Sequence, residues 1–231
     1  GQAKLNIKRV DGAKGHFRLS GSFSNATRDL AIDLKAQEDA KGIVATLLKI
    51  PDQPPLELSI VGQGPLDAFY ADINLASAGA PRLQGQIALE SVANPDAPAQ
   101  PVGSPLLDPI QVISADIHGD LAPLFTPKYR AFFGPDVAFT TVARRFSDGR
   151  LRLDQLLLTA AALELRGDLV LASSGMPERF ALDLALEAPN GAPILLPTTG
   201  PDVVIGRANL TANFNSALGD GWSLSGVVAD F

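Results

Sequence analysis

Apolar and polar residues alternate along most of this chain. In the segment 180–187, Phe180, Leu182, Leu184 and Leu186 hold every second position, with small or acidic residues between them. Successive side chains of a β-strand point to opposite faces of a sheet, so this period predicts a strand with one apolar and one polar face. Twelve further runs follow the same pattern: 5–10, 17–23, 30–36, 56–60, 71–75, 83–89, 113–118, 137–143, 151–158, 163–171, 209–214 and 222–228.

Turn-forming residues separate these runs. Asp11-Gly12, Asp148-Gly149 and Asp220-Gly221 have the composition of tight β-turns. The sequence therefore predicts an all-β fold, a meander of a dozen or more antiparallel strands. More than about ten strands normally force a sheet to curl, split or close. We expect a long twisted sheet curled into an open trough with an apolar concave face.

Two proline-rich stretches interrupt the alternation. Residues 94–109 carry five prolines, which suit an extended connector better than a central strand. This connector separates a first section, 1–93, from a second, 110–231, and we expect one continuous sheet to run through both. Residues 189–201 predict an irregular crossing without strand pairing, whose apolar residues are nevertheless sheltered.

One short helix is predicted near 121–133. Thr126 is a candidate N-cap, Pro127 suits the first helical position, and Gly134-Pro135 ends the segment. On a sheet protein such an apolar helix covers exposed core, plugs an opening or touches a membrane surface, and we favour simple packing over the exposed core.

Glycine recurs on the apolar face of the predicted strands. Glycine inside a strand marks a bulge, a bend or a close approach, and here we expect it to let the sheet curl and leave space in the concavity. Unrelated bends in a closed sandwich or barrel would give the same pattern. The six positions are Gly21, Gly62, Gly85, Gly119, Gly167 and Gly226.

The amino-acid composition argues against several classes of function. The net charge of -6, without a Lys/Arg stripe, argues against nucleic-acid binding. The absence of cysteine excludes thiolate catalysis and disulfides. No apolar run is long enough for a spanning helix. A start at Gly1 and an end at Phe231, within a strand-like run, suggest an excised piece of a longer protein.

No constellation of catalytic residues is apparent. The two histidines, His16 and His118, are about a hundred residues apart, and acids such as Asp168 and Asp183 alternate away from the apolar face. No hydrolase, metalloprotease or calcium-loop motif is present. We therefore expect no enzyme, no catalytic residue, no metal site and no cofactor.

The apolar face is then the candidate functional surface. A trough lined by aliphatic side chains suits acyl chains, since hydrocarbon needs no directional recognition. The alternative is a structural or adhesive β module with a sealed apolar core and the same alternation. The predicted lining residues are Phe17, Leu19, Ile32, Leu34, Leu58, Ile60, Ile73, Leu75, Ile87, Leu89, Leu169, Leu171, Leu182, Leu184, Leu186, Leu210 and Phe214.

Several segments resemble a known family. They are SDGRLRLDQLLLT (147–159), LELRGDLVL (163–171), GMPERF (175–180) and PNGAPILLP (189–197), with GPLDAFYADINL (64–75) and RLQG (82–85) in the same style. As a set they look like the TamB branch of the AsmA-like proteins, from Gly62 onward.

The resemblance implies more than the alternation does. It implies a trough-like sheet (a β-taco) in an inner-membrane-anchored protein of the Gram-negative periplasm, which conducts phospholipid toward the outer membrane. It also implies a partner, the outer-membrane assembly barrel TamA, bound through regions outside this fragment, and a role in outer-membrane protein assembly. The fragment then corresponds to an internal section, and its connector and helix interrupt a uniform trough.

Overall fold

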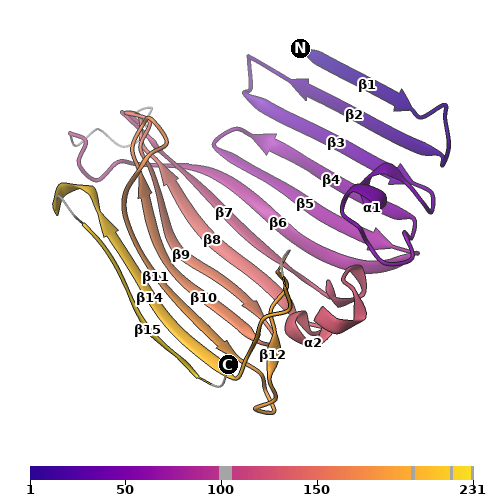
Figure 1. Cartoon of the computed structure of the whole chain (residues 1–231). Helices are drawn as coiled ribbons and strands as arrows, with labels where there is room; N and C mark the ends of the chain where they lie inside the picture. The colour runs from indigo at the N-terminus through magenta and orange to yellow at the C-terminus, as the bar shows by residue number, and fades with distance from the viewer. Residues whose placement is uncertain (99–105, 199–200, 219–220, 230–231) are drawn as a thin grey trace.

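One long antiparallel sheet dominates the structure. The computed structural model describes residues 1–98, 106–198, 201–218 and 221–229. Thirteen strands lie in the order β1-β2-β3-β4-β5-β6-β7-β8-β9-β10-β11-β14-β15, and β12 and β13 form a separate two-stranded sheet (Figure 1). All neighbours in the long sheet are antiparallel and adjacent in sequence, except that β12 and β13 intervene between β11 and β14. The predicted all-β meander of a dozen or more strands is confirmed.

The strands match the alternating runs of the sequence. Only Arg9 and Val10, the last two residues of the first run, lie outside a strand. The strands of the long sheet are β1 (Gln2–Lys8), β2 (Gly15–Phe23), β3 (Asp29–Glu38), β4 (Leu56–Pro65), β5 (Ala68–Ser77), β6 (Ala80–Val92), β7 (Ile110–Gly119), β8 (Val137–Arg145), β9 (Leu151–Ala160), β10 (Leu163–Leu171), β11 (Pro177–Glu187), β14 (Arg207–Asn215) and β15 (Trp222–Ala229).

The proline-rich connector joins two paired strands. β6 and β7 are hydrogen-bonded neighbours, and their register runs from Gln84↔His118 to Val92↔Ile110. The long sheet therefore continues across residues 94–109. Residues 99–105 of this predicted connector lie outside the described residues.

Most of the remaining structured segments leave the sheet at one end of its strands. α1 (Ile43–Leu47) connects β3 to β4, and the turns η1 (Ala122–Leu124), η2 (Pro127–Tyr129) and α2 (Arg130–Phe133) connect β7 to β8. β12 (Ile194–Leu195) and β13 (Val204–Ile205) connect β11 to β14 at the same end. Figure 1 looks onto the face where α1 and β12 lie in front of the strands. A single η3 turn (Ser216–Leu218) lies at the other end, before β15.

The structure confirms the helical segment near 121–133 and corrects two details of the connections. Thr126 stands at the N-cap of η2, but its side chain makes no capping hydrogen bond. Ile194 is sheltered, as predicted, yet Ile194 and Leu195 pair with β13, so this crossing is not free of strand pairing. The pairing satisfies backbone groups that burial of Ile194 would otherwise leave without partners.

A β-bulge in β9 keeps the apolar residues on both sides of it on the same face of the sheet. Leu153 and Leu156 both lie opposite apolar-face residues of β10, although three positions separate them. The extra residue is accommodated where Gln155 adopts a positive φ of 57°. An extra residue of this kind bends its strand and increases the local twist. Figure 1 shows β6 to β11 as visibly bent strands, whereas β1 to β4 are straighter.

Both edge strands of the long sheet are open. Every residue of β1 is exposed, and so is β15 from Trp222 to Val227. Within the described residues, no strand pairs with the outer edge of either. β1 carries Lys4 and Lys8, charges of the kind that discourage edge-to-edge association, whereas β15 has no charged residue.

Candidate functional site

A continuous apolar row crosses the whole sheet. The register of the strand pairs places one residue of each strand side by side on the same face, from β1 to β15. Every member is aliphatic, aromatic or glycine. This central row consists of Leu5, Leu19, Leu34, Ile60, Ile73, Gly85, Ile117, Phe139, Leu158, Leu165, Leu184, Leu210 and Gly226.

Further apolar rows flank the central row on the same face. One runs from β5 to β15, through Phe69, Leu89, Ile113, Ala143, Leu153, Leu169, Phe180, Phe214 and Trp222. Another crosses the first five strands and β6, through Ile7, Phe17, Ala36, Leu58, Leu75 and Leu83. We call the face that carries these rows the apolar face.

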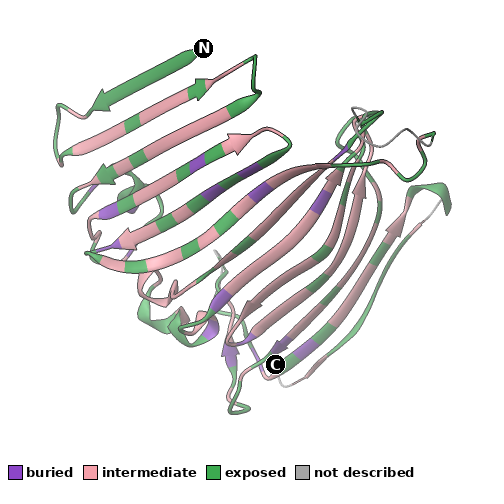
Figure 2. Cartoon of the chain, turned by 180° about the vertical axis from the view of Figure 1, so that it is seen from behind, coloured by how far each residue is buried: buried purple, intermediate pink, exposed green. Residues whose placement is uncertain are grey.

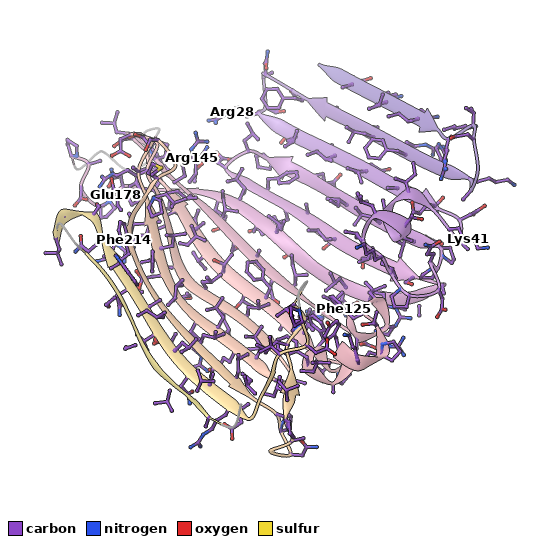
Figure 3. The ribbon with its side chains drawn as sticks, in the orientation of Figure 1. Arg28, Lys41, Phe125, Arg145, Glu178 and Phe214 are labelled. Atoms are coloured by element: carbon purple, nitrogen blue, oxygen red, sulfur yellow. The ribbon has the colours of Figure 1, made fainter. Side chains whose placement is uncertain are left out.

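All seventeen predicted lining residues lie on the apolar face. Strand register brings them together, because each belongs to one of these rows or stands an even number of positions from a member along its strand. Leu186 is buried and the other sixteen are half-buried. In Figure 3 the labelled Phe214 lies near one end of the strands, and Phe125 lies among the connections at the other end.

The lining residues predicted from the sequence include none from β7, β8 or β9, although these strands also carry apolar side chains on this face. Ile117, Phe139 and Leu158 belong to the central row but were not selected. The alternation of 113–118 and 137–143 contains the signal for the first two. The bulge at Gln155 hides the third, because it moves the apolar positions of β9 from odd to even numbers.

No described segment buries the central row. None of its thirteen members is buried, and in Figure 2 the buried positions are few and scattered. Within the described residues, the strands outside the long sheet are the two-residue strands β12 and β13, so no second large sheet covers this one. The accessible surface of the chain is 14332 Å², whereas a compact monomer of this mass exposes roughly 10,000 Å². The excess is what a single-layer sheet produces.

Apolar side chains are sheltered mainly where the connections fold over the strand ends. Phe132, Leu186, Ile194 and Ile205 form one buried cluster with Ala162 and Ala208. A second, smaller cluster consists of Ala45, Ile50 and Leu56. These clusters close one end of the apolar face and leave its middle uncovered.

The opposite face of the sheet is polar. A neighbouring row reads Lys4, Ser20, Asp33, Val61, Asp72, Gln86, Asp116, Thr140, Leu157, Arg166, Asp183, Thr211 and Ser225. Ion pairs join side chains of this face, including Arg144 and Arg152 on either side of Asp154. One wet and one apolar face is the arrangement that a half-solvated antiparallel sheet requires.

The two histidines lie apart and outside the apolar face. His16 Nε2 is 2.7 Å from Asn6 Oδ1. His118 Nδ1 is 3.9 Å from Asp116 Oδ1, and the side chain of Asp116 is 75% exposed. Among the described residues, no group of three or more His, Asp or Glu is placed to hold a metal ion.

Among the described residues, three side chains have shifted pKa values, and all three are at the surface. The backbone and guanidinium of Arg150 donate hydrogen bonds to Asp148 and lower the pKa of its carboxyl group. Tyr70 donates to Glu90, which raises the pKa of its phenol. A hydrogen bond to Asp202 raises the pKa of the Lys128 ammonium. None of the three belongs to the apolar rows.

Five of the six recurring glycines, all except Gly21, lie too close to a neighbouring strand to leave room for a side chain. A Cβ added at Gly85 would overlap the carbonyl oxygen of Asp116, and one added at Gly62 would lie 2.6 Å from the carbonyl oxygen of Tyr70. The interpretation that these glycines leave space in a concavity is therefore wrong for both positions. They allow adjacent backbones to approach closely.

Glu38 holds α1 against the apolar face. Its two carboxylate oxygens accept hydrogen bonds from the backbone N–H groups of Val44, at 3.0 Å, and Ala45, at 2.8 Å. Both are orphan donors of the first helical turn, which has no other side-chain cap. Sequence analysis did not predict α1.

Replacing Glu38 by alanine is expected to loosen α1 specifically. The lost bonds are equivalent to a helix cap, which contributes about 1 kcal/mol. Hydrogen exchange at the amides of Val44 and Ala45 should therefore accelerate about fivefold. Glu57→Ala, on the polar face of β4, is the matched control and should leave these amides unchanged. Equal protection in both variants would contradict the capping role.

The rows of the apolar face offer aliphatic and aromatic side chains, whose contacts are not directional. The described residues contain no helical candidate for a membrane span. No protein-family model, curated protein or solved structure matches the chain.

Proposed function

We propose that this chain is a section of a bridge that shelters phospholipid acyl chains on its apolar face during transport between two membranes. One observation carries the proposal: the central row runs through all thirteen strands of the long sheet, and no described segment buries it. A sealed core would instead show large side chains fully removed from water, and none is seen among the described residues. The role is one of binding and passage, without an enzymatic step.

The energetics of hydrocarbon support this use of the surface. Each methylene withdrawn from water contributes about 0.8 kcal/mol, so a chain of about sixteen carbons gains on the order of 10 kcal/mol before ordering costs. The gain is spread over many equivalent contacts rather than a few directional ones. A chain can then move along the rows without crossing a large barrier.

The dimensions of the sheet suit a conduit. Thirteen strands about 4.8 Å apart extend roughly 60 Å from edge to edge. We propose that the bend of the strands makes the apolar face the inside of an open trough, and that several such sections in series cross the periplasm. The resemblance to TamB-like proteins supports an inner-membrane-anchored protein of the Gram-negative envelope, with TamA as a partner of other regions. A contribution to outer-membrane protein assembly belongs to the same proposal.

Native mass spectrometry of the purified chain tests the proposal. We expect phospholipid to co-purify and to be released stepwise as collision energy rises, because the apolar face has no protein cover. Delipidated protein should take up phospholipid from vesicles. A lipid-free protein that takes up none would overturn the proposal and favour the structural or adhesive module.

A further inference from the structure

One pocket on the apolar face differs from the rest of the surface. It lies between α1 and strands β1 to β5 and has a volume of about 510 Å³. Ile7, Phe17, Ala36, Leu58 and Leu75, which are cross-strand neighbours on five adjacent strands, form its floor. Ile43 and Val44 of α1 line it as well. The pocket is thus an apolar channel with a partial cover.

The length of this floor matches one acyl chain. Five adjacent strands span about 19 Å across the sheet. The hydrocarbon core of a bilayer is about 30 Å thick and holds two layers of chains, so one chain extends about 15 Å. A single chain laid across β1 to β5 therefore fits within the pocket.

A cation stands at one end of the channel. Arg9 lines the pocket and follows Ile7 by two positions, so it belongs to the apolar face of β1. Its amide still bonds to the carbonyl of Gly15, which extends the pairing of β1 with β2 beyond Lys8. The Arg9 side chain is 24% exposed. Its one ion-pair partner among the described residues is Asp11, whose side chain is 86% exposed and 3.3 Å away. An exposed partner of this kind contributes little binding energy.

The acidic residue that lines the pocket is hydrogen-bonded to α1. This residue is Glu38, and both its carboxylate oxygens accept these bonds. A second, polar cavity shares Arg9, His16 and Glu38 with the channel and adds Lys8 and Lys14, opposed by Asp39 and Glu57. The Arg9 end of the channel therefore lies beside polar and charged side chains.

We propose that this pocket is a discrete site for a single-chain anionic amphiphile, a long-chain fatty acid, with its chain on the five-strand floor and its carboxylate at Arg9. A guanidinium and a carboxylate form two parallel hydrogen bonds, which are stronger than neutral ones. The assignment rests on the proposed function in that both place acyl chains on the apolar face. It adds a fixed position and a preference for a negative head.

Tryptophan fluorescence tests the site. Trp222 is the only tryptophan of the chain, so the Trp222→Phe variant has no tryptophan fluorescence of its own. On that background, Phe17→Trp reports on the pocket and Phe214→Trp reports on the other end of the apolar face. Bromine-labelled palmitic acid and the alcohol of the same chain are the two quenching probes. If Phe17→Trp perturbs folding, Val44→Trp on α1 replaces it.

We expect the acid to quench the pocket reporter saturably, at concentrations at least tenfold lower than the alcohol requires. Arg9→Gln should remove this difference and leave quenching by the alcohol unchanged, and Ala36→Phe should fill the channel and weaken both probes. Equal quenching by the two probes, or an Arg9→Gln variant that keeps the preference, would overturn the assignment.

The second reporter separates this inference from the proposed function. Quenching of Phe214→Trp without quenching of the pocket reporter overturns the pocket and supports an acyl-binding face elsewhere. Quenching of the pocket reporter alone supports the pocket and counts against a continuous lipid face. If neither reporter is quenched by either probe, both proposals are contradicted.

Discussion

The Leu184→Asp variant is expected to lose about 100-fold in phospholipid binding. Leu184 stands in the central row between Leu165 of β10 and Leu210 of β14. A carboxylate in contact with hydrocarbon costs about 2.5–3.5 kcal/mol by membrane-insertion measurements, and each 1.4 kcal/mol is a tenfold change in affinity. The measurement is uptake of labelled phospholipid from vesicles by delipidated protein.

The neighbouring residue provides the control. Ala185→Asp places the same charge on the same strand, but its cross-strand partners are Glu164 and Asn209 of the polar face. We expect it to bind lipid as the unsubstituted chain does. Lipid uptake reduced equally in both variants would show that charge alone, and not its position on the apolar face, causes the loss.

A second variant distinguishes lost lipid binding from lost stability. Leu184 also packs against the buried cluster around Phe132, so its replacement destabilises the chain to some extent. Leu34, in the central row of β3, lies outside both buried clusters. Leu34→Asp should lose lipid binding with a smaller fall in melting temperature. If either variant binds lipid normally while folded, the central row is not the binding surface.

The strands were predictable because their signal is local. Period-2 alternation between turn residues fixes a strand and its two faces without knowledge of its partners, which is why the sequence identified all thirteen strands of the long sheet. The helix α1 lacks such a signal. Its segment begins with the β-branched Ile43 and Val44, and its cap is Glu38, a side chain from the end of β3 rather than the residue before the helix.

The candidate site depended on information that is not local. That Leu19, Leu34 and Ile60 stand side by side follows from strand register, which the turn lengths set. In β9 the bulge at Gln155 sets the register as well. Whether such a row is covered is a property of the whole fold. An inward leucine has the same sequence environment whether its neighbour is protein or lipid, so only the three-dimensional arrangement exposes the uncovered middle of the face.

Gly85 of the central row is expected to be hard to replace, even by alanine. Gly85 lies between Ile73 of β5 and Ile117 of β7. A methyl group there would overlap the carbonyl oxygen of Asp116 and lie 2.6 Å from the Cα of Ile117. These are backbone atoms of a central strand, which no side-chain rotation can move away.

Gly85→Ala is therefore expected to destabilise the chain by about 3 kcal/mol, near the upper end for overpacking. In a chain of this size that corresponds to a fall in melting temperature of roughly 10 °C, measured by circular dichroism. Gly21→Ala is the matched control, because its added methyl group meets only the carbonyl oxygen of Ala31, at an ordinary 3.7 Å. It should change stability by less than about 0.5 kcal/mol. Equal melting temperatures for the two variants would mean that β6 and β7 separate easily, and that the close approach of backbones does not explain the recurrence of glycine on the apolar face.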